Sequence, residues 1–234
     1  ITTDFIVGFP GEGESEWRES IEFIERTGFG HLHIFAFSPR AGTLAAEMPQ
    51  NTTREIMRPR SQELHDLGMR LKRDVLQQNL GQIYEHGRGA PQDYKAAVKW
   101  YKLAAEQGDA DTQYRLGTMY DNRQGVPRDV KEVVKWYRRA AEQGNVFAQN
   151  ILGFKYEYGE GVPQDYKTAV KWYRLAAEQG DAAAQFGLGL MYSKGQGVSL
   201  NVKTALNLIR SAAENGHGLA AKSLKKMRRA LISE

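Results

Sequence analysis

The sequence contains no cysteine and no long apolar run, and each absence excludes a class of site. Without cysteine, its 234 residues can form no disulfide, no thiolate zinc site and no cysteine-ligated iron–sulfur cluster. No run reaches the roughly 18 consecutive apolar residues that a membrane-spanning helix needs, so no membrane partner is expected. With 41% hydrophobic and 26% charged residues, the chain otherwise has the composition of one or two globular domains.

Positive charge is in slight excess, with a formal net charge of +4. It is dispersed along the chain except for one cluster near the C-terminus, formed by Lys222, Lys225, Lys226, Arg228 and Arg229. Such a cluster can bind phosphate groups, but a solvated helix face is the favoured interpretation. A protein partner is therefore expected ahead of a nucleic acid.

A repeat of 36 residues runs through most of the chain. Trp-Tyr pairs begin at Trp100, Trp136 and Trp172, and Leu-Gly pairs begin at Leu80, Leu116, Leu152 and Leu188. Ala-Ala-Glu-Gln-Gly ends at Gly108, Gly144 and Gly180, and a variant, AAENG, ends at Gly216. A fixed period of this length is typical of proteins that stack one supersecondary unit repeatedly.

Each copy predicts two antiparallel helices. In the second copy, the first helix covers Ala110–Asn122, and a turn follows in which Gly125 can adopt positive φ. Asp129 and Glu132 form a predicted capping box at the start of the second helix, which ends at Gly144. The short connections favour packing of neighbouring helices against one another.

A glycine recurs in the middle of each first helix, for example Gly117, although it costs about 1 kcal/mol relative to alanine there. We therefore expect another helix to approach too closely for a β-carbon, with the Trp and Tyr rings in an outer layer. The predicted fold is a mainly α solenoid. Its helix pairs are placed near residues 74–108, 109–144, 145–180 and 181–216, with a capping helix at 217–234.

The pattern LGxxYxxGxGxPxDYxxAxxWYxxAAEQG resembles the Sel-like repeats (SLR), a branch of the tetratricopeptide-like helical repeats. This resemblance implies a scaffold or adaptor that binds a protein or peptide in its concave groove. In the tetratricopeptide family the first helix of each pair lines that groove. The corresponding positions are Gln78, Gln82, Glu85 and His86 in the first pair, Tyr114, Thr118, Asp121 and Asn122 in the second, Phe147, Asn150, Phe154, Glu157 and Tyr158 in the third, and Phe186, Leu190 and Lys194 in the fourth.

The three phenylalanines of this set, Phe147, Phe154 and Phe186, allow two interpretations. They can pack between neighbouring repeats, or they can form an aromatic groove for apolar side chains of a peptide, bordered by Glu157 and Lys194. The sequence leaves both open.

Residues 1–73 do not repeat and predict a small βαβ(α) segment. Apolar strands are expected at Thr3–Phe9 and Leu32–Phe37, with a helix at Glu14–Thr27 between them. Trp17, Ile21, Ile24 and Phe23 are the candidates for its buried face. A further helix follows, which Pro59 is expected to interrupt or start afresh.

The stretches TDFIVGFPGE and HLHIFAFSPRAGTLAAEMP resemble the radical-S-adenosylmethionine tRNA methylthiotransferases, in particular the threonylcarbamoyladenosine branch. The resemblance implies the last part of a partial barrel whose CxxxCxxC cluster motif would lie upstream of Ile1. That family uses S-adenosylmethionine and iron–sulfur clusters. The resemblance would also place five residues near the cofactor, which are vestigial here because the cluster ligands are missing from this chain: Gly8, Gly11, Glu12, Ser38 and Arg40.

No catalytic residue and no cofactor are therefore expected in this chain by itself. His31 and His33 alternate on a predicted strand, but a structural role is favoured over a metal site. Two functions remain: an interaction scaffold, or the C-terminal portion of a radical-S-adenosylmethionine tRNA methylthiotransferase. The enzyme-like segment favours the cytoplasm, with the periplasm or secretion as alternatives. The partner, the oligomeric state, and whether the chain is a fragment, remnant or chimaera stay open.

Overall fold

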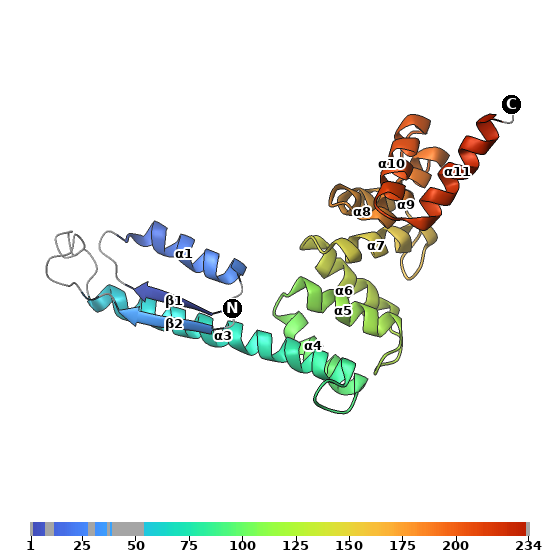
Figure 1. Cartoon of the computed structure of the whole chain (residues 1–234). Coiled ribbons are helices and arrows are strands. Elements are labelled where there is room, and N and C mark those ends of the chain that lie inside the picture. The colour runs from blue at the N-terminus through green and yellow to red at the C-terminus, as the bar shows by residue number, and fades with distance from the viewer. Residues whose placement is uncertain (1, 8–11, 28–30, 37, 39–53, 233–234) are drawn as a thin grey trace. The chain divides into compact units, whose positions relative to one another are not determined.

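The computed structural model describes residues 2–7, 12–27, 31–36, 38 and 54–232 and forms two compact units, Ile1–Leu80 and Gly81–Glu234 (Figure 1). The division lies inside helix α3 (Arg54–His86), whereas the sequence pattern placed the domain boundary between residues 73 and 74. Within the described ranges, no helix is both long and apolar enough to cross a membrane.

The first unit contains a parallel βαβ arrangement, as predicted. Strands β1 (Thr2–Val7) and β2 (His31–Ala36) pair in parallel, with Thr2 opposite His31 and Val7 opposite Ala36. Helix α1 (Glu14–Thr27) lies between them in the chain. A parallel pair needs such a crossover because its two strands start at the same edge.

Helices α1 and α3 cover one face of this two-stranded sheet with apolar side chains. The buried cluster consists of Val7, Trp17, Ile21, Ile24, Leu32, Leu64 and Leu67. Trp17 also donates its indole N–H to Glu63 over 2.9 Å, which satisfies the one polar atom of a ring that is 1% exposed.

Two sequence expectations for this unit were wrong. Phe23 is 50% exposed, because it lies two residues after Ile21 and therefore about 200° around the helix from it. Pro59 neither interrupts the helix nor starts a new one, but lies inside α3, near its start. A proline there removes one backbone hydrogen bond, and the remaining turns of the helix continue.

The second unit is a stack of helix pairs closed by a single helix, which confirms the predicted α-solenoid (Figure 1). The end of α3 and α4 (Tyr94–Glu106) form the first pair. The others are α5 (Ala110–Asp121) with α6 (Val130–Glu142), α7 (Val146–Tyr158) with α8 (Tyr166–Glu178), and α9 (Ala182–Lys194) with α10 (Val202–Glu214), followed by α11 (Gly218–Ile232).

Aspartate caps α4, α6 and α8 and asparagine caps α10, but the predicted capping box at Asp129 and Glu132 is absent. Asp129 accepts hydrogen bonds from the backbone N–H groups of Lys131 and Glu132, over 2.9 and 3.3 Å. The Glu132 carboxylate instead accepts the indole N–H of Trp136 over 2.8 Å and binds Lys135. The glutamate therefore orients a core tryptophan one turn away.

The recurring glycines of the first three pairs contact tyrosine rings, which corrects the expectation of an outer aromatic layer; Gly189 in the fourth pair contacts Ile209. Tyr137 and Tyr173 are 2% and 3% exposed and lie against Gly117 and Gly153. A β-carbon on Gly153 would come within 2.5 Å of the Tyr173 ring. The rings are inside because the glycine removes the side chain that would keep the second helix at a distance.

A buried glutamine links each pair to the next. Gln149 donates to the carbonyl of Ala141 over 3.0 Å, and its oxygen accepts a hydrogen bond from Gln179 over 2.8 Å. The same arrangement joins Gln113 to Gln143 and Gln185 to Asn215. These bonds satisfy buried amides that would otherwise be costly, and they explain the recurring glutamine of Ala-Ala-Glu-Gln-Gly.

Candidate functional site

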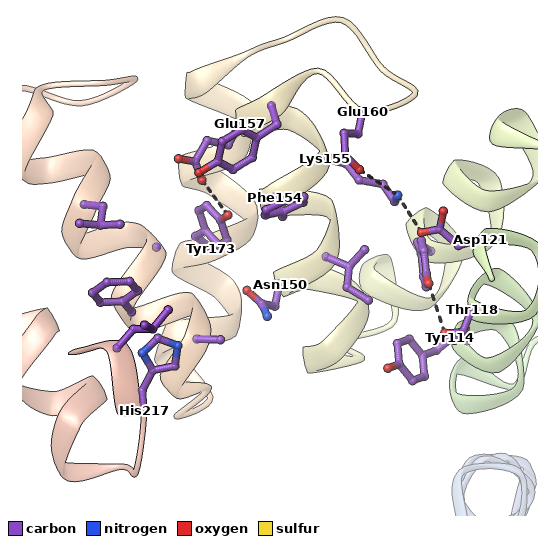
Figure 2. A pocket seen from close by; sticks show the side chains of 18 of the residues that line it. Tyr114, Thr118, Asp121, Asn150, Phe154, Lys155, Glu157, Glu160, Tyr173 and His217 are labelled. Carbon is purple, nitrogen blue, oxygen red and sulfur yellow. Dashed lines mark hydrogen bonds and ion pairs between the residues drawn. The ribbon is translucent and has the colours of Figure 1, made fainter. Parts of the chain in front are cut away.

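A pocket of about 630 Å³ opens between the first helices of the last three pairs. Its walls come from α5, α7 and α9, with additional side chains from α6, α8 and the start of α11 (Figure 2). We call it the inner pocket. All of it belongs to the second unit.

Most of the residues predicted for the concave groove line this pocket. They are Tyr114, Thr118, Asp121, Asn122, Asn150, Phe154, Glu157, Tyr158, Phe186 and Leu190. The predicted residues that do not line it are Gln78, Gln82, Glu85, His86, Phe147 and Lys194. All four predicted positions of the third pair after Phe147 therefore line the pocket.

The pocket also contains residues that the sequence interpretation missed. They are Tyr137, Ile151, Lys155, Glu160, Tyr173, Ala183, Gly187, His217 and Leu219. Lys155 could have been found from the register, because Met119 and Met191 occupy the same position one repeat before and after it. A lysine at a position that is otherwise apolar is an exception that the repeat itself does not require.

The aromatic side chains of the pocket differ in how much of their surface is free. Phe154 and Tyr158 are 44% and 56% exposed, and their ring centroids are 4.5 Å apart. Phe186 packs instead against the cluster around Ile209, with its ring centroid 4.7 Å from that of His217. Phe154 and Tyr158 thus present apolar surface to the pocket, whereas part of Phe186 is committed to the core.

A buried ion pair lies at one end of the pocket. Lys155 Nζ is 2.9 Å from Asp121 Oδ2, and the lysine side chain is only 4% exposed (Figure 2). Arg128 binds the other oxygen of Asp121 over 2.8 Å. Burial alone would raise the pKa of Asp121, but the hydrogen bonds from Lys155 and Arg128 outweigh it, so the pKa lies below its ordinary value.

A buried carboxylate lies at the other end. Glu157 is 6% exposed and accepts a hydrogen bond from the hydroxyl of Tyr173 over 2.8 Å (Figure 2). Burial, followed by the charge of Glu157, raises the pKa of Tyr173, so its hydroxyl remains a donor at neutral pH. The negative charge of Glu157 also raises the pKa of Tyr158.

The repeated part of the chain matches a known family. The model of the Sel1 repeat matches residues 76–109, 110–145, 146–181 and 182–217, which is more than half of the chain. The chain belongs to the Sel1 repeat family. Proteins of this family are commonly interaction scaffolds for other proteins.

Two solved structures of Sel1 repeat proteins resemble the chain. A Sel1 repeat protein from Oxalobacter formigenes is 36% identical with a TM-score of 0.62, covering 69% of this chain and 48% of that one. A protective antigen present in uropathogenic Escherichia coli strains, which displays an SLR fold, is 32% identical with a TM-score of 0.65. That match covers 89% of this chain and 43% of the antigen.

Methylthiotransferases match a shorter stretch. The ribosomal protein uS12 methylthiotransferase RimO of Syntrophobacter fumaroxidans is 40% identical over 83 residues, which is 36% of this chain and 19% of that enzyme. The threonylcarbamoyladenosine tRNA methylthiotransferase MtaB of Thermotoga maritima is 29% identical over 118 residues, or 49% of this chain and 24% of the enzyme. The chain thus spans about a fifth to a quarter of the length of these relatives. Its assignment to the threonylcarbamoyladenosine branch stays a prediction.

The predicted vestigial cofactor residues lie before the Sel1 repeats. Gly8, Gly11 and Arg40 are outside the described residues, and Ser38 is exposed. Glu12 forms an ion pair with Arg60 over 3.1 Å, and the arginine side chain is 7% exposed.

His31 and His33 were the two candidate metal ligands of the sequence. His31 lies on strand β2, and His33 Nδ1 is 2.9 Å from Asp4. Within the described ranges, no three histidine or acidic side chains converge to hold a metal ion.

Proposed function

We propose that this Sel1 repeat chain is an interaction scaffold that binds an extended peptide segment of another protein in the inner pocket. The observation that carries the proposal is the exposed pair of rings, Phe154 and Tyr158, beside the buried carboxylate of Glu157. Aromatic side chains at the centre of a concave surface are typical anchors of protein interfaces.

The composition of the pocket supports a peptide rather than a flat protein surface. Its walls are mostly apolar, while Asn150 projects an amide that forms no side-chain hydrogen bond with the described residues (Figure 2). An unpaired amide can both donate to and accept from the backbone of an extended segment, and apolar pockets can take its alternate side chains.

Affinity capture with the full chain tests this proposal. Phe154→Ala is expected to remove most of the captured partner, because truncation of a central anchor commonly costs more than about 2 kcal/mol of binding free energy. Phe186→Ala is expected to have a similar or smaller effect, since part of that ring packs against the Ile209 cluster.

Leu103→Ala is the matched control. Leu103 is an apolar side chain, 39% exposed, on α4 outside the inner pocket. Partners that are retained by Leu103→Ala and lost by Phe154→Ala bind at the pocket. If Phe154→Ala and Phe186→Ala both captured the same partners as the unaltered chain, the pocket assignment would be wrong.

A second candidate function follows from the methylthiotransferase matches. We propose as the alternative that the chain is the C-terminal portion of such an enzyme and is not catalytically competent by itself. The support is 40% identity over 83 residues to RimO and the parallel βαβ arrangement of the first unit. Determining the gene sequence upstream of Ile1 tests it: a CxxxCxxC motif favours the enzyme, and a start codon or signal peptide in its place rules it out.

A further inference from the structure

The first helix of each of the first three pairs carries one acidic residue four positions after its central glycine. These residues are Glu85, Asp121 and Glu157. Two of them have a cation supplied by the following pair. Arg115 lies 3.7 Å from Glu85, which His86 also approaches, and Lys155 lies 2.9 Å from Asp121.

The third acid has no such cation. The positions equivalent to Arg115 and Lys155 in the following pair are Gly187 and Met191, and neither carries a charge. No lysine, arginine or histidine of the described part of the chain lies within ion-pair distance of Glu157, although this residue is 6% exposed. Buried carboxylates are normally paired, so the missing cation requires an explanation.

Glu157 lines the inner pocket, so a cation from outside the chain can approach it from there. Gly187 lines the inner pocket at the position that Arg115 occupies in the second pair, so the following pair contributes no charged side chain there, and the Tyr173 ring lies against Gly187. The exposed rings of Phe154 and Tyr158 line the same pocket. Aromatic faces attract cations and accommodate the apolar stem of a lysine or arginine.

We propose that the inner pocket contains a subsite for one lysine or arginine side chain of the bound peptide, whose charged group pairs with Glu157 while its stem lies along Phe154 and Tyr158. The partner segment would thus supply the cation that the following pair supplies to Glu85 and Asp121. This proposal rests on the proposed function and specifies the chemistry of its ligand.

Positional peptide libraries test the subsite with the full chain. Four pools of pentapeptides with randomised flanking positions carry lysine, arginine, norleucine or glutamate at the centre, and their binding is measured by fluorescence polarisation. Because a hydrogen bond to a charged group is stronger than one between neutral groups, the lysine and arginine pools should bind roughly tenfold or more tightly than the norleucine pool. The glutamate pool should bind most weakly.

Two substitutions locate the effect. Glu157→Gln preserves an acceptor for the Tyr173 hydroxyl, so the fold should be retained and the preference for lysine and arginine over norleucine should vanish. Gly187→Arg supplies an internal cation and should abolish the same preference. Gly187→Ala is its control, because its added β-carbon would also meet the Tyr173 ring at 3.0 Å but brings no charge, and the preference should remain.

The outcomes separate this proposal from the one on which it rests. Binding of all four pools with equal affinity, or a preference that survives in Glu157→Gln, overturns the cation subsite and leaves peptide binding intact. Failure of every pool to bind contradicts peptide binding in the pocket and the subsite with it. Loss of the preference in Glu157→Gln and Gly187→Arg, but not in Gly187→Ala, supports both.

Discussion

The second and third helix pairs share one skeleton and differ mainly where they face the inner pocket. In both, a central glycine lies under a tyrosine ring and a buried glutamine reaches the preceding pair. Yet Thr118 corresponds to Phe154, and Met119 corresponds to Lys155. The contacts that hold neighbouring helices together recur, whereas the side chains of the pocket change their size, polarity and charge.

This difference separates structural positions from positions that are free to vary. Some residues contact another helix by packing against a glycine or through a hydrogen bond between side-chain amides. The size and polarity of such a residue must fit its partner, so its identity recurs every 36 residues. A residue that faces open space has no such partner. The exceptions to the repeat are therefore the positions at which to look for function.

The largest expected effect comes from filling the space above the central glycines. In Gly153→Ala the new β-carbon would lie 2.5 Å from the Tyr173 ring, against 2.9 Å from Tyr137 in Gly117→Ala. Overpacking costs about 1–3 kcal/mol, and better helix propensity returns about 1 kcal/mol. We expect a loss of about 2 kcal/mol for Gly153→Ala and a smaller loss for Gly117→Ala, measured by urea unfolding.

Gly218→Ala is the control for this comparison, because a β-carbon there would meet nothing within 4 Å. It should leave the unfolding midpoint close to that of the unaltered chain. An equal or larger loss in Gly117→Ala would contradict the idea that the third pair is the more tightly packed of the two.

A smaller effect is expected at the turn after the first helix. Arg123 adopts φ 59°, in the left-handed region, where the third pair has Gly159 at φ 72°. A residue with a β-carbon costs roughly 1–2 kcal/mol in this conformation, part of which the extra freedom of unfolded glycine offsets. Arg123→Gly should therefore stabilise the chain by about 1 kcal/mol in thermal or urea unfolding, and Gly159→Ala should destabilise it by a similar amount.

The pH-dependent effect concerns the ion pair between Asp121 of the second pair and Lys155 of the third. The pKa of Asp121 is lowered in the folded chain, so its ionised form adds stability above the ordinary value of 3.8, and this contribution is lost as the pH falls through the lower, folded pKa. Asp121→Asn should be less stable than the unaltered chain at pH 7. The two unfolding midpoints should converge below about pH 3.8; a constant difference down to pH 2 would show that the charge is not its cause.

Much of the fold could be predicted because the signals are local and recur. The helix bounds follow from Asp and Asn caps, left-handed glycines and the 36-residue register; Asn145, for example, caps α7 and accepts the N–H of Ala148. The position of the tyrosine rings was not predicted. Periodicity shows that a glycine face and a tyrosine belong to the core, but it does not show that one lies directly on the other.

The candidate site was predicted less completely, for a physical reason. The resemblance to the tetratricopeptide family, carried along the 36-residue register, is what assigned Phe154 and Leu190 to one groove. Residues that enter the pocket from other elements, such as Tyr173 from α8 and His217 before α11, depend on how far their side chains reach across a helix boundary. That distance is a property of three-dimensional packing and has no counterpart in the spacing of one helix.

The glutamine links between pairs have a consequence for how such a chain can change its length. Each link joins only adjacent pairs: Gln149 uses a carbonyl of the preceding helix and the amide of Gln179, and Gln185 repeats this with Asn215. A complete 36-residue unit inserted after Gly144 would therefore find the Ala141 carbonyl as a ready acceptor for its own glutamine, and it would present an equivalent carbonyl to the glutamine of the unit that follows. The architecture tolerates gain or loss of whole modules, so that the length of its binding surface can evolve separately from the chemistry of any one repeat.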